Sequence, residues 1–157
     1  RDIILDELVK GMKWKILDSY ECIHNYVDTS PKTLDTFVSP MLRKGAISAK
    51  KDERVIIPIN MCDGILLGTG LGNTEWNCSA PHGSGRIMKR KEVKQNFTVS
   101  TFKSKMKGIY SSCISKETLD EAPFAYRDLE DIADVIGETV TIDRILRPVY
   151  NFKAGGN

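Results

Sequence analysis

The chain has 157 residues, of which 41% are hydrophobic and 28% are charged, and its formal net charge is +2. This length fits one domain with a core of ordinary size, and the composition excludes both an intrinsically disordered chain and a membrane-embedded one. No apolar run approaches the ~20 residues that a membrane-spanning helix needs, so we expect no membrane partner. No signal pattern opens the chain, and because it begins with Arg1 and not Met we expect a fragment or a processed product.

The four cysteines are scattered along the chain and form no C-x-x-C pair: Cys22, Cys62, Cys78 and Cys113. This spacing favours reduced thiols and a cytoplasmic protein over a disulfide framework. It also argues against a zinc site built from cysteine alone. The simpler interpretation of each cysteine is a small apolar residue of the core.

In chain order, the first half predicts one helix followed by short extended segments. Residues 3–10 carry apolar side chains at helical spacing. Aromatic and β-branched residues favour extended structure over residues 14–27, and a turn is expected at residues 29–31. Further strands are expected at residues 37–49 around a Lys44-Gly45 turn, at residues 55–59 and at residues 65–67.

The second half predicts a long loop and then helices. Residues 68–85 contain five glycines, and a glycine-rich loop of this length is often functional. Helices are expected from residue 86 or 87 to 97, after Ser100, and at residues 115–121, where Pro123 ends the pattern. Asp128 is positioned to cap a last helix that Gly137 ends, and residues 141–152 return to extended structure.

These elements alternate without regular βαβ units and show no internal repeat. The pattern therefore predicts an α+β fold with a mixed, β-rich core and peripheral helices. We expect residues 1–157 to form a single domain or the C-terminal part of a larger one.

The small net charge hides an asymmetry along the chain. Residues 83–107 contain eight basic residues and one acid, whereas residues 116–144 contain nine acids and three bases. A basic block beside a glycine-rich loop indicates a polyanionic partner. A solvated helix face explains the block equally well on charge alone.

Residues 79–86 read Ser-Ala-Pro-His-Gly-Ser-Gly-Arg and carry the strongest local signal. Closely spaced backbone N–H groups at the two glycines, followed directly by a helix, would form an anion site. Arg86 and Arg90 are four residues apart, on one helix face, and arginine binds phosphate bidentately. His82 at the mouth of such a site is placed to attack phosphorus. An ordinary surface-loop histidine remains the alternative.

The other histidine, His24, follows Cys22 by two residues, so in a strand both side chains point to one face. A Cys/His pair suits a borderline metal, but two ligands do not complete a site. A hydrogen-bonded strand histidine is the simpler interpretation.

Five ordered motifs and a lysine near the C-terminus add information that no single motif carries. The motifs are Cys-Ile-His-Asn-Tyr-Val (22–27), Arg-Lys-Gly-Ala-Ile-Ser-Ala (43–49), Ile-Pro-Ile-Asn-Met (57–61), Cys-Ser-Ala-Pro-His-Gly-Ser-Gly-Arg-Ile-Met-Lys-Arg (78–90) and Glu-Ala-Pro-Phe-Ala-Tyr-Arg-Asp (121–128), and the lysine is Lys153. From about Tyr20 onward the chain resembles the C-terminal part of the RtcB family of RNA ligases.

The resemblance implies a GTP- and manganese-dependent (Mn²⁺) RNA ligase. Such an enzyme joins a 3′-phosphate or 2′,3′-cyclic phosphate end to a 5′-hydroxyl end. By position, His82 resembles the histidine that becomes guanylylated, and His24 resembles a manganese ligand. The implied nucleotide-binding residues are Asn25, Pro58, Ile59, Asn60, Met61, Gly83, Ser84, Gly85, Tyr126 and Lys153. The implied phosphate- or RNA-binding residues are Lys44, Arg86 and Arg90.

Two departures from the family pattern favour an alternative, a truncated or diverged homologue that binds RNA or a partner without catalysis. Ile59 stands where many members have glycine, and we expect its side chain to alter the backbone's approach to a nucleotide. The resemblance also implies that the remaining manganese ligands, an Asp/Cys pair and two further histidines, belong to an N-terminal segment that this chain lacks.

Overall fold

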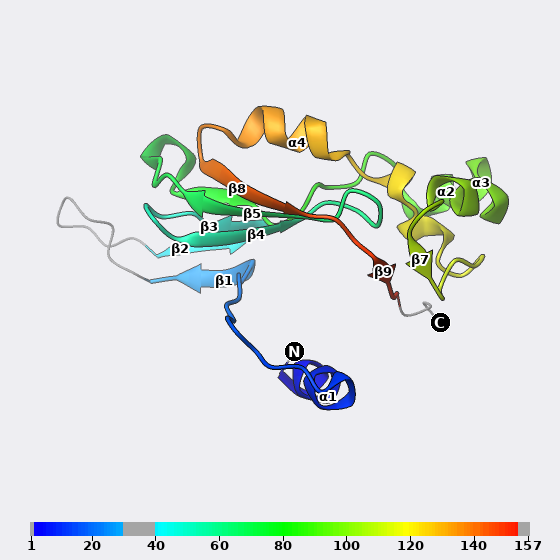
Figure 1. Cartoon of the computed structure of the whole chain (residues 1–157). Coiled ribbons are helices and arrows are strands. Elements are labelled where there is room, and N and C mark those ends of the chain that lie inside the picture. Colours follow the sequence, from blue (N-terminus) through cyan, green and yellow to red (C-terminus); the bar gives the residue numbers. More distant parts are fainter. Residues whose placement is uncertain (1, 30–39, 154–157) are drawn as a thin grey trace.

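The computed structural model describes residues 2–29 and 40–153, which form short strands and short helices (Figure 1). The helices are α1 (Asp2–Met12), α2 (Arg90–Asn96), α3 (Val99–Lys105) and α4 (Leu129–Ile136), with single 3₁₀ turns at Thr74–Trp76, Leu119–Glu121 and Pro123–Ala125. The strands are β1 (Asn25–Asp28), β2 (Met41–Lys44), β3 (Ala46–Ser48), β4 (Arg54–Pro58), β5 (Ile65–Gly70), β6 (Ser79–Pro81), β7 (Tyr110–Ser111), β8 (Val140–Leu146) and β9 (Tyr150–Asn151). The predicted α+β class is confirmed.

Three antiparallel strands in the order β4-β5-β8 form the main sheet. Alternation along β4 buries Val55 and Ile57, and β5 buries Leu66 in the same core. The apolar face of α4 packs on this core through Ile132 and Ile136, and Figure 1 shows α4 lying along the sheet. We call this cluster, which also includes Ile47, Ile59 and Ala80, the sheet core.

Gly68 permits the close approach of β5 to β8. A Cβ atom there would lie 2.5 Å from Val140 Cγ1 and 2.6 Å from the Thr141 carbonyl oxygen. Both distances are below van der Waals contact, and the strand register shifts at the same point, between Leu67 and Gly68. Glycine therefore belongs to the packing of the central strand.

Two further strand pairs meet at Gly45. β1 pairs with β2, and β3 pairs with β6, both antiparallel. Gly45 connects β2 to β3 with a φ of +68°, a conformation that glycine adopts without a steric penalty. The end of β6, and with it the residue that follows, is thereby brought next to the start of β1.

A second cluster, the helical core, lies under α2 and α3. Phe102 is completely buried there, and its ring meets Phe124 edge-on at 6.5 Å. The other buried members are Met61, Val93, Met106, Leu119, Ala122 and Ala125. Met61 lies three residues after the end of β4 at Pro58, so the chain passes from one core to the other in this loop.

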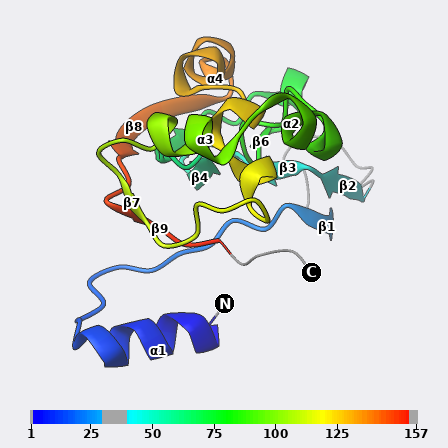
Figure 2. The ribbon, with the colours of Figure 1, turned by 90° about the vertical axis from the view of Figure 1, so that its right-hand side faces the viewer.

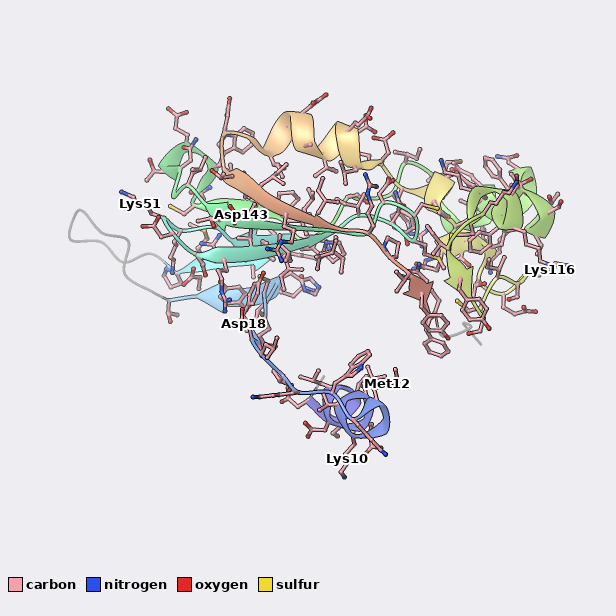
Figure 3. The ribbon with its side chains drawn as sticks, viewed as in Figure 1. Lys10, Met12, Asp18, Lys51, Lys116 and Asp143 are labelled. Atoms are coloured by element: carbon pink, nitrogen blue, oxygen red, sulfur yellow. The ribbon has the colours of Figure 1, made fainter. Side chains whose placement is uncertain are left out.

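The predicted N-terminal helix is confirmed as α1, but none of its residues is buried. Figures 1 and 2 show α1 set apart from the sheet at the end of an extended segment. The side chains of Lys10 and Met12 on this helix, labelled in Figure 3, are exposed. Ile3 is 80% exposed and Ile4 67%, whereas Val9 is partly covered by the segment that follows the helix.

The helix predicted to begin at residue 86 or 87 begins at Arg90 instead. Arg86 forms a β-bridge with Tyr126, and Ile87 N donates to the Ala125 carbonyl, so the chain is held extended there. The Glu92 carboxylate accepts from Lys89 N at 2.9 Å, which fixes the start of α2. No helix therefore follows the glycine loop directly, and the predicted helix-dipole contribution to an anion site at that loop is wrong.

Other predicted bounds also change. Within residues 14–27, regular strand begins only at Asn25, and residues 68–85 contain the end of β5 and all of β6. Residues 115–121 form only a 3₁₀ turn, and Pro123 begins a further turn in place of ending a helix. The turn predicted at residues 29–31 lies outside the described residues.

The last helix follows the sequence closely. The Asp128 carboxylate accepts from Asp131 N at 3.0 Å and caps α4 as predicted. None of the four cysteines forms a disulfide and all are partly buried, and three of them, Cys22, Cys62 and Cys113, pack against the two cores. Among the described residues, no helix has the length and apolar composition needed to cross a bilayer.

Truncating Phe102 to alanine will test the helical core. We expect Phe102→Ala to lower the free energy of unfolding by about 3–5 kcal/mol, because it opens a cavity in a fully packed cluster. Phe152→Ala is the matched control, since that side chain is 71% exposed, and it should change stability little. Urea denaturation of both variants is the measurement, and equal effects would contradict the described packing.

Candidate functional site

A cleft of about 960 Å³ lies where the end of β4, the glycine loop and the C-terminal segment meet. The segment from β8 to β9 leaves the sheet toward α2 and α3 and supplies one side of the cleft (Figure 1). Its lining contains most of the predicted nucleotide-binding residues: Pro58, Ile59, Asn60, Met61, His82, Gly83, Ser84, Gly85, Tyr126 and Lys153. The fold thus brings together around one cleft residues that lie between positions 58 and 153 of the chain.

The glycine loop is clamped to the end of β4. Ser84 N donates to the Pro58 carbonyl at 3.2 Å, and Ser84 Oγ donates to the Ile59 carbonyl at 2.7 Å. A Cβ on Gly83 would lie 3.3 Å from the Pro58 oxygen, and Gly85 has a φ of +74°. Both glycines are therefore required by the path of the loop, as the sequence predicts for a tight turn.

The imidazole of His82 is held by the main chain. Its Nδ1 lies 2.8 Å from the Gly45 carbonyl oxygen. A carbonyl oxygen only accepts, so Nδ1 carries the proton in this hydrogen bond. In the neutral ring, the other nitrogen, Nε2, then holds a free lone pair. This is the tautomer that a nucleophilic histidine requires when Nε2 is the attacking atom.

His24 stacks on His82, with ring centroids 4.6 Å apart and planes inclined by 10°. Gly45 N donates to the His24 carbonyl at 3.2 Å and to Asn25 Oδ1 at 3.3 Å. Gly45 therefore links His24, Asn25 and His82, which lie far apart in sequence. Lys44, exposed, pairs with Asn25 across β1 and β2 and lies next to this group.

The described residues do not form a metal site by themselves. Within residues 2–29 and 40–153, no three His, Cys, Asp or Glu side chains gather around one point. Cys22 lies in an irregular segment, and its Sγ is 3.7 Å from the Arg54 carbonyl. His24 stands as one candidate ligand, and the predicted Cys22–His24 strand face is not formed.

In the loop after β4, the side chains pack in the two cores or hydrogen-bond within the loop, which leaves the backbone to line the cleft. Ile59 is 4% exposed because its side chain packs in the sheet core, although the residue also lines the cleft. Its expected effect on the backbone's approach to a nucleotide stays a prediction. Met61 is 3% exposed in the helical core. Asn60 Oδ1 accepts from the backbone N–H groups of Cys62 and Asp63, both at 2.9 Å, and so stabilises the turn.

Arg86 and Arg90 face carboxylates, contrary to the expectation that one helix face aims both at phosphate. Arg86 Nη2 lies 2.6 Å from Glu121 Oε1, and Arg90 Nη1 lies 2.7 Å from the same oxygen. Arg90 also pairs with Asp120, which is 8% exposed. The acidic residues of the second half of the chain thus neutralise part of its basic block.

Tyr126 lies in the same network at the cleft. Its hydroxyl donates to Glu121 Oε2 at 2.6 Å, and Arg86 Nη2 donates to the hydroxyl oxygen at 2.7 Å. Burial, together with the hydrogen bond to Glu121, raises the pKa of Tyr126 to about 12. The phenol is therefore neutral at physiological pH. Lys153 Nζ lies 3.6 Å from Glu121 Oε2.

Sequence reasoning missed two contributors to the cleft lining and the residue that holds His82. Glu121 was interpreted only as part of a helix start, and the segment from Leu146 to Asn151 only as extended structure. Gly45, whose carbonyl binds His82, was interpreted only as a turn. Asn151 Nδ2 donates to the Met61 carbonyl at 2.8 Å and fixes that segment to the loop after β4. Glu121 opens the last quoted motif, which was a usable signal, whereas nothing local marks Asn151.

The fold and the cleft together define a protein class, an α+β protein in which a backbone hydrogen bond orients a histidine beside a glycine-lined cleft. The family model described as tRNA-splicing ligase RtcB matches residues 2–154, so the chain belongs to the RtcB family. This agrees with the resemblance drawn from the ordered motifs.

Individual relatives agree with the family. The chain is 30% identical over 150 residues to the RNA-splicing ligase RtcB1 of Escherichia coli ATCC 25922, and also to the RNA-splicing ligase RtcB of Escherichia coli K12. Each alignment covers 96% of this chain and 36% of the relative. The tRNA-splicing ligase RtcB of Aeropyrum pernix is 36% identical over 103 residues, covering 60% of this chain and 21% of that protein. The chain thus spans about a third of the length of the curated relatives it matches.

The tautomer of His82 is directly measurable. We expect ¹⁵N shifts of the neutral imidazole to show Nδ1 protonated and Nε2 unprotonated, because the Gly45 carbonyl accepts from Nδ1. The chain has two histidines, so a His24→Gln variant leaves one signal for assignment. A neutral ring protonated mainly at Nε2 would contradict the described hydrogen bond.

Proposed function

We propose that this chain is the nucleotide-binding, C-terminal part of a longer GTP- and manganese-dependent RNA ligase. The enzyme would join RNA 3′-phosphate or 2′,3′-cyclic phosphate ends to 5′-hydroxyl ends through a guanylyl group on His82. The observation that carries the proposal is the Gly45–His82 hydrogen bond, which leaves Nε2 unprotonated at the cleft. Family membership supports the same reaction class.

His82 acts as the nucleophile in the first step. Nε2 attacks the α-phosphorus of GTP, an N–P bond forms, the α–β phosphoanhydride bond breaks and pyrophosphate leaves. An oxygen of the RNA 3′-phosphate then attacks the same phosphorus, the N–P bond breaks, and His82 recovers its lone pair. The 5′-hydroxyl finally attacks the activated 3′-phosphorus and GMP leaves. A cyclic end must first be opened by water to the 3′-phosphate.

The remaining residues of the cleft would bind and orient the nucleotide. Gly83, Ser84 and Gly85 bring backbone close to the phosphate beside His82, because their loop is clamped against Pro58. Tyr126 and Lys153 lie at the other side of the loop, past Arg86, where the base would bind. Asn25 holds Gly45 and so supports His82 indirectly.

Manganese enters this proposal through one residue of the chain. His24 is the candidate manganese ligand, and the other ligands would come from outside the described residues. The ion, when bound, would offset negative charge on the reacting phosphates. The steps above are therefore assigned only to side chains of this chain.

RNA would bind along the basic side of α2 and α3. Arg86, Arg90 and Lys94 pair with acids, but five lysines there are exposed and form no ion pair within the described part of the chain: Lys89, Lys91, Lys103, Lys105 and Lys107. Exposed lysines on adjacent helices suit contacts with a phosphate backbone. The four free cysteines support a reducing, cytoplasmic setting for the enzyme.

Covalent labelling tests the proposal. The full protein that contains this chain, incubated with α-³²P-GTP and Mn²⁺, should acquire an acid-labile label at His82. We expect His82→Ala to abolish the label, because the variant lacks the imidazole nitrogen to which the proposal assigns the attack on the α-phosphorus. Val135→Ala, 69% exposed on α4, is the surface control and should label normally.

A folded full-length protein that takes no label, or a His82→Ala variant that labels like the wild type, contradicts the proposal. RNA binding that persists without GTP and survives His82→Ala, in a protein that takes no label, would instead support the non-catalytic RNA-binding alternative. The single candidate metal ligand and the five exposed lysines are the observations that favour that alternative.

A further inference from the structure

Arg43 is a buried arginine whose guanidinium group connects two strand pairs. It lies on β2 and is 3% exposed. Its Nε and Nη2 atoms each lie 3.1 Å from Oδ2 of Asp28, the last residue of β1. Its Nη1 donates to Oγ of Ser79, the first residue of β6, and lies 3.4 Å from the Asn77 carbonyl oxygen. One side chain therefore ties the β1–β2 pair to the β3–β6 pair.

The two segments that Arg43 ties together end at the candidate nucleophile. Gly45 follows Arg43 by two residues, and His82 follows Ser79 by three. The Gly45 carbonyl oxygen accepts from the backbone N–H of His82 at 3.4 Å and from its ring Nδ1 at 2.8 Å. A displacement of β2 against β6 would therefore move the hydrogen-bond acceptor away from the imidazole.

Apolar burial gives the β1–β2 pair little information about its register. In β1 and β2, which the structure describes completely, the two buried side chains are those of Asp28 and Arg43, both charged. Val27 and Leu42 lie opposite each other in this pair and are 55% and 71% exposed. Strand register is strongly specified where an apolar face is buried, and weakly where it is not. The charged contact must therefore supply what apolar packing does not.

A buried ion pair suits this task. Removing two charges from water costs about as much as their attraction returns, so the best-attested use of such a pair is to specify register. A one-residue slip of β2 would turn the Arg43 side chain to the opposite face of the strand, away from Asp28. Lys50 Nζ also faces this carboxylate, at 3.6 Å, but its side chain is 44% exposed and follows β3, so it does not constrain β2. The contact therefore favours the register in which Gly45 meets His82.

We propose that Arg43 is a positioning residue for His82. By binding Asp28 and Ser79, it fixes the strand registers that bring the Gly45 carbonyl to the imidazole. That carbonyl then determines which ring nitrogen is protonated and which is free to attack. This inference rests on the proposed function, because only a nucleophilic histidine gives the choice of nitrogen a chemical consequence. Arg43 acts through the backbone of β2 and does not line the cleft.

Nitrogen chemical shifts in the full protein that contains this chain test the role. With ¹⁵N-histidine incorporated, the His82 signals are those lost in His82→Gln, and they are recorded at a pH where the ring is neutral. Arg43→Lys keeps the positive charge, but its single nitrogen cannot reach both Asp28 and Ser79. We expect the ratio of Nδ1-protonated to Nε2-protonated ring to fall by about 3- to 10-fold, the range that one hydrogen bond contributes.

The rate of His82 labelling by GTP separates positioning from binding. At saturating GTP, Arg43→Lys should slow labelling by about 3- to 10-fold, for the same reason. The dissociation constant for GTP should stay unchanged, because Arg43 does not line the cleft. Arg144→Lys is the matched control, since Arg144 is an exposed arginine of β8 outside the cleft lining, and it should change neither quantity.

A double variant guards against misfolding. Arg43→Met combined with Asp28→Leu removes both charges, and apolar residues of similar volume often preserve stability at a buried ion pair. Ser79 Oγ keeps its own hydrogen bond to the Asn77 carbonyl at 3.0 Å. We expect a folded protein with the same loss of tautomer preference. An unchanged tautomer ratio in either folded variant, or a double variant that does not fold, overturns the positioning role.

The two proposals fail separately. A wild type that takes no label at His82, with a tautomer ratio that falls in both Arg43 variants, removes the guanylylation and leaves the orientation of His82 by Arg43 intact. A wild type that labels at His82, with an unchanged ratio in both variants, overturns only the role of Arg43. A lower GTP affinity and a lower urea midpoint with an unchanged ratio also overturn it, because Arg43 would then contribute only to stability.

Discussion

The contact between Gly45 and His82 is the constraint on which the rest of the site depends. Gly45 is the corner where the β1–β2 pair passes into the β3–β6 pair, and its carbonyl accepts a hydrogen bond from His82 Nδ1 at 2.8 Å. The registers of the two strand pairs thus determine where that carbonyl points. A change in either register would move the carbonyl, and with it the protonated nitrogen of the imidazole.

The cleft exists because two separate cores stand on either side of it. The sheet core holds Ile59 and the helical core holds Met61, so the intervening loop is anchored at both ends by buried side chains. Loops supported in this way can present backbone groups in a fixed position while their side chains contribute only packing. The backbone from Ile59 to Met61 is therefore held in a fixed position at the cleft lining.

The basic block of residues 83–107 has two parts, one paired with carboxylates and one exposed. Asp120 and Glu121, from the acidic second half of the chain, neutralise Arg86, Arg90 and Lys94 beside the cleft. The lysines of α2 and α3 farther along the block are exposed and form no ion pair within the described residues, as the proposed contact with RNA requires. The weak net charge of the chain is therefore the sum of a locally paired network and an exposed basic surface.

The sequence by itself determined the α+β class, the apolar strands at β4 and β5, the Asp128 cap of α4 and the family, because these follow from local periodicity, capping chemistry and ordered motifs. It also singled out His82 and His24 as candidates. Only the tertiary structure decided that their rings stack, that His82 Nδ1 hydrogen-bonds to the Gly45 carbonyl, that α2 begins at Arg90 and that the arginines face Glu121. Each of these depends on hydrogen bonds or ion pairs between residues distant in sequence, and no local pattern encodes which partner a side chain will meet.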